Sequence, residues 1–327
     1  MNERNYDLHR RTISILVPCY NEEAVLQQFY ARTVKVLATI PMYDFNFVFV
    51  NDGSKDRTLE IMRSLRERDK RVNFVNLSRN FGKEITMIAG IDYLTGDAVI
   101  IMDADLQDPP ELIPEMISWW EKGYDDVGPK RRSRAGETFF KKWSSHTFYK
   151  ILQKVSKIPI QPDVGDFRLL DRQCIEALRL LRESQRYTKG LFSWIGFNKK
   201  EIPFDRDARA AGKTKWNYWK LTNLAIEGIT SFTIAPLRLA AFVGCILALL
   251  AMVYMIFIII KTLLFGGDVA GYPSLITVIL FIGGVQLFFM GIMGEYIGRI
   301  FCESKCRPLY LVKTYNDKLI IDQKEKN

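Results

Sequence analysis

Residues 99–110 read Val-Ile-Ile-Met-Asp-Ala-Asp-Leu-Gln-Asp-Pro-Pro, an apolar run that ends in three carboxylates and two prolines. The run predicts a strand, and the carboxylates of Asp103, Asp105 and Asp108 repel one another unless a cation or a proton joins them. Oxygen ligands of this kind suit a hard divalent ion, Mg²⁺ or Mn²⁺. The alternative is an acidic turn in which Asp108 caps a helix beginning at one of the prolines. Because a D-x-D pattern alone recurs by chance, the rest of the chain has to decide.

Upstream of this stretch, short β-branched runs alternate with helical stretches. The expected strands are 13–18, 45–52, 72–77 and 98–103, and the expected helices are 22–37, 56–69 and 81–94. This alternation is typical of βαβ units, so we expect an α/β, Rossmann-like domain with a mostly parallel sheet. Ligands of such sheets bind beyond the carboxyl ends of the strands. The four strand ends are polar and several are acidic, so one pocket can collect them.

Two apolar runs near the end of the chain, Leu239–Ile260 and Pro273–Gly294, contain no charged residue. Each has about 22 residues, enough to cross a hydrocarbon core of about 30 Å, so we expect a membrane hairpin rather than two buried core helices. The loop between the runs has only Lys261 as a basic residue, whereas the outer flanks carry Arg238, Arg299, Lys305, Arg307 and Lys313. The positive-inside rule then places both termini in the cytoplasm, in a multi-pass membrane protein.

The composition narrows the partners and the chemistry. A net charge of +9 fits a protein on an anionic leaflet, and without a nucleic-acid-binding motif no nucleic acid partner is expected. Residues 1–12 are polar, which predicts no cleaved signal peptide. The five cysteines form no disulfide framework, and Cys302 with Cys306 lacks a second pair for a metal site. With two histidines in the chain, carboxylates, arginines and a metal have to carry the chemistry.

Five motifs in order carry a resemblance to a known family. They are Val17-Pro-Cys-Tyr-Asn-Glu-Glu, Val50-Asn-Asp-Gly-Ser-Lys-Asp, Asp103-Ala-Asp-Leu-Gln-Asp-Pro-Pro, Gly165-Asp-Phe-Arg-Leu and Arg206-Asp-Ala-Arg-Ala-Ala-Gly-Lys-Thr-Lys. With the two apolar runs, the chain resembles the polyprenyl-phosphate glycosyltransferases, family 2 inverting glycosyltransferases with the GT-A fold. Bactoprenol glucosyltransferases are the closer group, and dolichol-phosphate mannose synthases are related. The resemblance covers about Ile13 to Arg299.

The resemblance implies a reaction at the cytoplasmic face of a bacterial cytoplasmic (inner) membrane. A nucleotide sugar gives its hexose to undecaprenyl phosphate with inversion, for modification of a cell-envelope polysaccharide. UDP-glucose is the preferred donor, and GDP-mannose is the alternative. A non-enzymatic membrane module that binds a nucleotide is an alternative from a different class.

The resemblance also implies roles for single residues. It assigns Pro18, Glu22, Asp52, Lys83 and Asp103 to the nucleotide sugar. The metal ligands would be Asp103, Asp105 and Gln107, and the catalytic residues would be Asp105 and Asp166. Glu22 can instead be a first-turn helix carboxylate. Asp166 resembles the family's catalytic base, but a lipid phosphate is largely dianionic at pH 7, so we expect Asp166 mainly to position the acceptor or stabilise positive charge on the sugar. A structural salt bridge between Asp166 and Arg168 is the alternative.

Cations have to hold the acceptor phosphate beside an anionic donor, and guanidinium groups bind phosphate bidentately. The candidates are Arg131, Arg134, Arg206, Arg209 and Lys213. Arg131 follows Asp126-Val-Gly-Pro-Lys, where Pro129 replaces a residue that related sequences place in a strand. Because proline removes a backbone donor, we expect this strand to end early or to lie at a sheet edge.

The expected organisation has four parts. A cytoplasmic GT-A domain occupies 1–210, juxtamembrane interfacial helices 211–236, the transmembrane hairpin 237–299 and a cytoplasmic tail 300–327. The end of the tail, 316–327, is polar and expected to be mobile. In the second apolar run, small residues offer a packing surface for a homo-oligomer, namely Gly283, Gly284, Gly291 and Gly294.

Overall fold

The computed structural model describes residues 10–131, 164–184, 186–204, 233–265 and 271–320. The chain divides into two compact units, one formed by residues 1–224 with 307–327 and the other by residues 225–306. The predicted interfacial helices at 211–236 fall almost wholly outside the described residues. Each unit is described by itself.

The first unit is built on a nine-stranded sheet with the order β7-β5-β6-β4-β1-β2-β3-β8-β9. Its strands are β1 (Thr12–Cys19), β2 (Asp44–Asn51), β3 (Val72–Leu77), β4 (Ala98–Ile101), β5 (Asp126–Arg131), β6 (Arg168–Asp171), β7 (Lys199–Phe204), β8 (Val312–Tyr315) and β9 (Lys318–Leu319). The central strands β4, β1, β2 and β3 are parallel, whereas β6 and β8 are antiparallel to their neighbours β4 and β3. The predicted α/β fold is confirmed.

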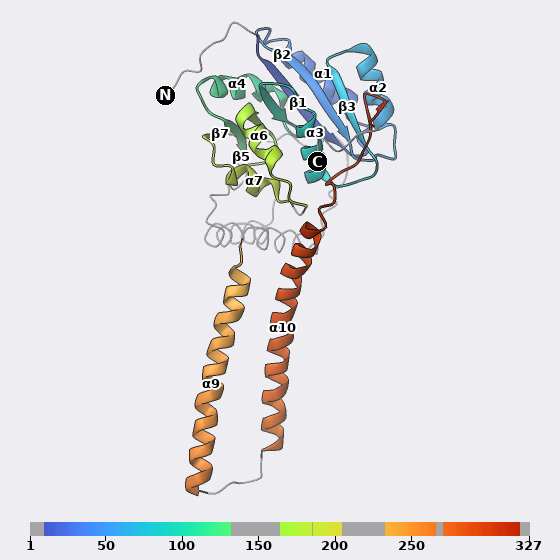
Figure 1. Cartoon of the computed structure of the whole chain (residues 1–327). Helices are drawn as coiled ribbons and strands as arrows, with labels where there is room; N and C mark the ends of the chain where they lie inside the picture. The colour runs from blue at the N-terminus through green and yellow to red at the C-terminus, as the bar shows by residue number, and fades with distance from the viewer. Residues whose placement is uncertain (1–9, 132–163, 185, 205–232, 266–270, 321–327) are drawn as a thin grey trace. The chain divides into compact units, whose positions relative to one another are not determined.

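Helices cover both faces of the sheet, which explains why its central strands are almost continuously apolar (Figure 1). The helices are α1 (Leu26–Leu37), α2 (Thr58–Arg68), α3 (Lys83–Asp92), α4 (Ile113–Glu121), α6 (Arg172–Leu180) and α7 (Thr188–Trp194), with a short 3₁₀ helix η1 (Pro110–Leu112) before α4. Alternate residues of β1 separate the faces. Ile13 and Ile15 lie in the core that α1, α2 and α4 complete, and Leu16 packs against α3.

Two local predictions differ from the structure. The strand that contains Pro129 neither ends early nor lies at an edge, because β5 runs to Arg131 between β7 and β6. Its pairing with β7 continues through Pro129, whereas its pairing with β6 covers only Asp126 and Val127. The proline therefore lies beyond the last β5–β6 pair of the ladder, where the loss of its N–H costs no bond to β6.

The C-terminal segment also differs from its prediction. Instead of leaving the fold after the apolar runs, residues 312–319 add β8 and β9 to the sheet. Tyr310 donates a hydrogen bond from its hydroxyl to Asp92, 2.6 Å away, and the ring of Tyr315 packs on Tyr93 with centroids 4.9 Å apart. From residue 307 on, the predicted tail is thus a part of the first unit.

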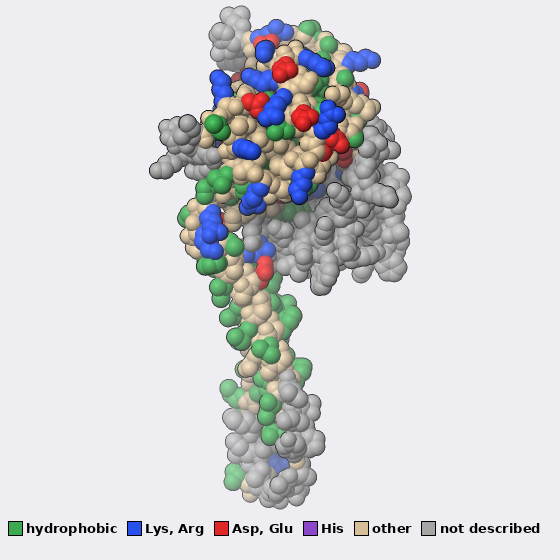
Figure 2. Space-filling model, turned by 90° about the vertical axis from the view of Figure 1, so that its right-hand side faces the viewer, with side chains coloured by type: hydrophobic (Ala, Val, Ile, Leu, Met, Phe, Trp, Pro, Cys, Tyr) green, Lys and Arg blue, Asp and Glu red, His purple; other side chains and the backbone are tan. Residues whose placement is uncertain are grey.

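The second unit contains two long helices, α9 (Ala235–Phe265) and α10 (Tyr272–Ser304). Windows at Pro236–Tyr254 and Phe281–Ser304 are long and apolar enough to cross a membrane, and neither window is buried. Apolar side chains line the described parts of the helices (Figure 2). The hydroxyl of Tyr296 donates to the carbonyl of Thr233, 2.7 Å away, within the same unit.

Candidate active site

The loops after β1 and β2 bind each other through side-chain caps. The amide of Asn21 donates to Ser54 Oγ at 3.0 Å, and the amide of Lys55 donates back to Asn21 Oδ1 at 2.9 Å. Asn21 has a φ of 57°, a left-handed conformation that asparagine tolerates better than most residues. The parallel pairing of β1 with β2 brings these loops to the same edge of the sheet, so two of the predicted motifs are in contact there.

Asp52 holds the next loop in place. Its carboxylate accepts hydrogen bonds from the amides of Phe81, at 2.7 Å, and Gly82, at 3.0 Å, and the residue is buried. Burial raises the pKa of Asp52, although the two amides act in the opposite direction. Gly53 lets the backbones approach, because a Cβ at this position would lie 2.6 Å from the carbonyl carbon of Arg79. Asp52 thereby fixes the start of α3.

Lys83, the first residue of α3, joins two of the predicted carboxylates. Its ammonium nitrogen lies 2.7 Å from Asp103 Oδ1, 2.8 Å from Asp103 Oδ2 and 2.6 Å from Asp166 Oδ2. The sheet register explains the meeting. Ile101 of β4 pairs with Arg168 of antiparallel β6, so Asp103 and Asp166 both lie two residues beyond this pair, at the same end. Sequence motifs identified both carboxylates, and the antiparallel pairing of β4 with β6 brings the two side chains together.

The charges around Lys83 and Asp166 shift the pKa values of these two groups. Burial alone would lower the pKa of Lys83, but the carboxylates of Asp103 and Asp166 outweigh it and raise the lysine pKa well above its usual range. Burial alone would raise the pKa of Asp166, but Lys83 and, more weakly, Lys189 hold it well below its usual range. Asp166 is therefore a carboxylate anion at neutral pH.

The remaining acidic motif residues lie in a tight loop after β4. The amide of Gln107 donates to Asp105 Oδ1 at 3.1 Å, and buried Leu106 between them has a φ of 60°. A left-handed leucine costs about 1–2 kcal/mol, so the surrounding loop has to impose it. Asp108 is buried, and it lies one residue before Pro109, the N-cap of η1.

Arg168 contributes to the site through the backbone that precedes Asp166. Its guanidinium binds the buried Asp126 at 2.9 Å and the carbonyl of Gly165 at 3.0 Å, and it lies 3.8 Å from the centroid of the Phe192 ring. Its ion pair is with Asp126, whereas Asp166 pairs with Lys83, which speaks against the alternative of an Asp166–Arg168 salt bridge. Holding the Gly165 carbonyl fixes the backbone just before Asp166.

Glu84 is a further residue of the site that the motifs did not identify. Its carboxylate accepts a hydrogen bond from the amide of Thr188, at 3.0 Å, at the start of α7. Burial and the nearby charge of Asp166 raise the pKa of Glu84 to about 7. No local motif marked Glu84, because its partner, the amide of Thr188, lies 104 residues later in the chain.

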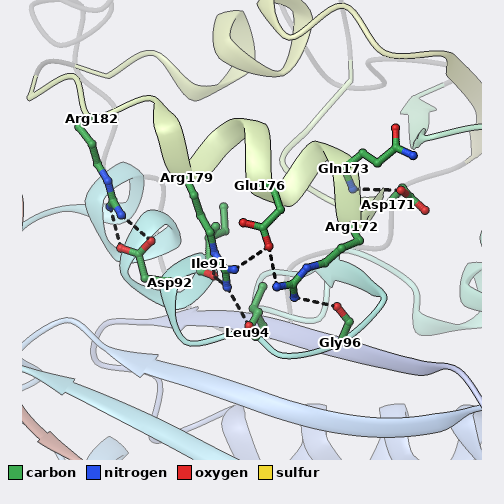
Figure 3. A network of polar contacts seen from close by, with 10 residues as sticks. All are labelled: Ile91, Asp92, Leu94, Gly96, Asp171, Arg172, Gln173, Glu176, Arg179 and Arg182. Atoms are coloured by element: carbon green, nitrogen blue, oxygen red, sulfur yellow. Dashed lines mark hydrogen bonds and ion pairs between the residues drawn. The ribbon is translucent and has the colours of Figure 1, made fainter. Parts of the chain in front are cut away.

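Two arginines, one in the last turn of α6 and one just after it, bind the C-terminal end of α3 (Figure 3). Arg182 binds Asp92 through two contacts of 2.7 and 2.9 Å, and Arg179 donates to the carbonyls of Ile91 and Leu94, each within 2.7 Å. Cationic donors at a helix C-terminus satisfy carbonyls that lack an intrahelical partner and complement the helix dipole. Since Asp52 holds its beginning and the arginines hold its end, α3 is a rigid support for Lys83 and Glu84.

The other predicted site residues are spread around this cluster. Pro18 lies near the end of β1, and Arg131 ends β5. The amide of Glu22 donates to Thr58 Oγ1 at 2.8 Å, and because α1 begins at Leu26, Glu22 precedes the helix and is not in its first turn. The other predicted acceptor-phosphate ligands lie outside the described residues, namely Arg134, Arg206, Arg209 and Lys213.

Most of the chain matches known proteins. Residues 14–179 match glycosyl transferase family 2, and residues 235–300 match the GtrB C-terminal hairpin. An uncharacterized glycosyltransferase of Synechocystis sp. is 49% identical over 92% of this chain and 94% of its own length. A bactoprenol glucosyl transferase of Shigella phage SfV is 45% identical over 94% of this chain and 99% of its own length.

Among solved structures, a mannosyltransferase from Pyrobaculum calidifontis in complex with GDP-Man and Mn²⁺ is similar, with a TM-score of 0.44 and 18% identity over 66% of this chain and 61% of its own. The matched family models and the relatives in the curated sequences agree on one family. The chain belongs to glycosyl transferase family 2, and its residues 235–300 form a hairpin of the GtrB type.

Proposed function

We propose that the protein transfers glucose from UDP-glucose to a polyprenyl phosphate, undecaprenyl phosphate in a bacterial membrane, with inversion at the anomeric carbon. The observation that carries the proposal is the likeness to bactoprenol glucosyl transferases over more than nine-tenths of the chain, hairpin included. Two helices long enough to cross a membrane suit an enzyme whose acceptor is a lipid. We place the reaction at the cytoplasmic face, where nucleotide sugars are made.

On the donor side, Asp103, Asp105 and Gln107 are the proposed ligands of Mg²⁺ or Mn²⁺. These residues offer hard oxygen donors, but among the described residues no group of three or more His, Cys, Asp or Glu side chains could hold a metal alone. Such a set fits an ion that takes its remaining ligands from substrate phosphates, as Mg²⁺ commonly does. A divalent cation bound there stabilises the negative charge that develops on the leaving diphosphate. Pro18, Glu22 and Asp52 are proposed to line the nucleotide site.

On the acceptor side, the proposed reaction needs little base catalysis. A phosphate monoester has a second pKa near 6, so most of the lipid acceptor is a dianion at pH 7. Lys83 holds the pKa of Asp166 well below its usual range, and a carboxylate with so low a pKa is a weak base. This supports the role of Asp166 in stabilising positive charge on the sugar and in orienting the acceptor. Arg131, Arg134, Arg206, Arg209 and Lys213 are proposed to bind the acceptor phosphate.

The test is a transfer assay with the full-length protein in lipid nanodiscs that contain undecaprenyl phosphate. Radiolabelled UDP-glucose, UDP-galactose and GDP-mannose are supplied separately, with Mg²⁺, with Mn²⁺ or with EDTA. We expect one labelled lipid, from UDP-glucose, that requires the divalent ion and is lost in Asp105→Asn. Anomeric configuration is read from the product by NMR. A labelled product from GDP-mannose alone would show that GDP-mannose, and not UDP-glucose, is the donor. If folded protein gave no labelled lipid with any donor, the proposal would be overturned.

A further inference from the structure

Lys83 lies where two carboxylates from different loops converge. Its ammonium contacts both oxygens of Asp103 and one oxygen of Asp166, all within 2.8 Å. Within the described ranges it is the only cation in an ion pair with Asp103. The protein therefore provides its own positive charge at the carboxylate where a divalent ion is proposed to bind.

Two cations that share one carboxylate repel each other. A Mg²⁺ ion binds its oxygen ligands at about 2.0–2.1 Å, so an ion on Asp103 would lie within a few ångströms of the ammonium. Such an ion becomes favourable when the ammonium has another anion to bind. A diphosphate supplies that anion, together with the oxygen ligands that the protein lacks.

The side chain of Lys83 can make this exchange without a change of fold. Its backbone is held by α3, whose first turn follows the loop bound by Asp52, while its side chain is 40% exposed and has four rotatable carbon–carbon bonds. Asp166 is less exposed, at 14%, and its backbone is fixed through Gly165 by Arg168. The ammonium can therefore leave Asp103 and stay near Asp166.

We propose that Lys83 is the resident counter-cation of Asp103, so that the free protein binds divalent cations weakly and takes them up together with a nucleoside diphosphate. This inference rests on the proposed function for the identity of the metal ligands. It adds an order of binding that the donor site enforces. Lysine is suited to the role because it is a compact charge on a flexible stem, whereas a guanidinium would bind the carboxylate as a fixed fork.

The experiment measures Mn²⁺ binding directly, by electron paramagnetic resonance of free Mn²⁺, with full-length protein and no sugar present. The variant is Lys83→Met, which keeps the length of the side chain and removes its charge. Lys35→Met, at an exposed position of α1, is the matched control. For wild type we expect UDP to raise Mn²⁺ affinity at least about tenfold. For Lys83→Met we expect Mn²⁺ affinity without UDP to rise about tenfold, because the competing charge is gone.

Two further variants make the result specific. Asp103→Asn placed in the Lys83→Met protein should remove the gain in Mn²⁺ affinity, and Lys83→Arg should behave as wild type without UDP. If Lys83→Met does not give the melting curve of a folded protein, Lys83→Gln replaces it. Equal Mn²⁺ affinity of the folded wild type and the folded uncharged variant, without UDP, would overturn the proposal.

The outcome is separable from that of the proposed function. Binding of Mn²⁺ is read without turnover, so linked binding without sugar transfer would leave the inference standing and refute the activity. If the protein transfers sugar but its Mn²⁺ affinity does not change in Lys83→Met, the activity would stand and the inference would be refuted.

Discussion

At the scale of single residues, Asp166 offers the sharpest test of the proposed chemistry. Its carboxylate is anionic because Lys83 lies 2.6 Å away, so its proposed contribution is a charge and an orientation. We predict that Asp166→Asn lowers kcat for sugar transfer by about 10²–10³-fold, the usual cost of removing one group that stabilises transition-state charge. UDP affinity should change by less than about twofold, since the amide keeps the shape.

The control for this prediction is Glu67→Gln, an exposed carboxylate on α2. It should transfer sugar as fast as wild type. Turnover of Asp166→Asn close to that of this control would remove both the electrostatic and the positioning role. A parallel loss of UDP affinity would instead indicate a damaged donor site.

Glu84 gives a prediction about pH. Burial and the charge of Asp166 raise its pKa from 4.5 to about 7, and the groups around it are Lys83, Lys189, Arg186 and the Thr188 amide. In the unfolded chain this carboxyl ionises near 4.5, so its contribution to native stability is full below that pH and is lost as pH rises through 7. Glutamine cannot ionise and avoids this loss.

We therefore predict that the stability of Glu84→Gln relative to wild type rises by roughly 2 kcal/mol between about pH 5 and pH 8. In thermal unfolding of the detergent-solubilised protein this is a gain of roughly 5 °C in the difference between the two midpoints. The Glu67→Gln protein, measured in the same buffers, should show no such trend. A Glu84→Gln difference that stays constant with pH would contradict the raised pKa.

The site shows what a sequence can and cannot predict at this scale. Asp103 and Asp166 could be identified from the sequence because each lies in a short local motif, which can be recognised without knowing the fold. The partner of Arg168 could not be read in the same way, since Asp126 lies 42 residues earlier and meets it only when β5 and β6 pair. Lys83 was identified as a donor-site residue, but its bridge between two carboxylates depends on the register of β4 with β6.

At the scale of elements, the contact between the loops after β2 and β3 depends on a glycine. Gly53 has a φ of 64°, and a Cβ there would lie within 2.9 Å of three backbone atoms of Arg79 and Asn80. Neither backbone can move away cheaply, because Asp52 holds the same loop through Phe81 and Gly82. We predict that Gly53→Ala lowers the free energy of unfolding by about 3 kcal/mol or more, as read from the thermal midpoint.

Gly196 is a control position that distinguishes backbone strain at a positive φ from a steric clash of the added Cβ. It has a similar φ of 72°, but a Cβ there would meet its nearest neighbour at 3.8 Å. Gly196→Ala should therefore cost only the left-handed strain, about 1–2 kcal/mol. Equal losses in the two variants would mean that the loops after β2 and β3 can separate without cost.

The elements that were predicted well are those whose pattern is self-contained. The strands β1 to β4 are apolar runs bounded by polar loops, and each was expected within a few residues of its place. The C-terminal strand β8 was missed because its partner β3 is more than two hundred residues earlier, and its short sequence, Val-Lys-Thr-Tyr, has no distinct pattern. Pro129 was misread because proline marks a missing hydrogen bond but not the side of the strand on which the bond is missing.

At the scale of the whole molecule, the apolar hairpin and the catalytic fold were both readable from sequence, whereas assembly was not. At four glycines of α10, Gly283, Gly284, Gly291 and Gly294, no described atom other than the helix's own nearby backbone lies within 4 Å of where a Cβ would stand. These positions are open to a helix of a second copy, and a homo-oligomer through this face remains a prediction.

Membrane orientation is the last prediction, and it follows from charge. Basic residues flank the hairpin on its outer sides, whereas its loop carries only Lys261, so both ends of the chain should face the cytoplasm. In a variant without native cysteines, Gly271→Cys should react with a membrane-impermeant maleimide in intact spheroplasts. A variant that retains Cys306 alone should react only after permeabilisation, although this thiol is exposed on the protein. Both should react in detergent, which controls for reactivity, and the reverse pattern in spheroplasts would place the proposed active site on the side of the membrane opposite to the nucleotide sugars.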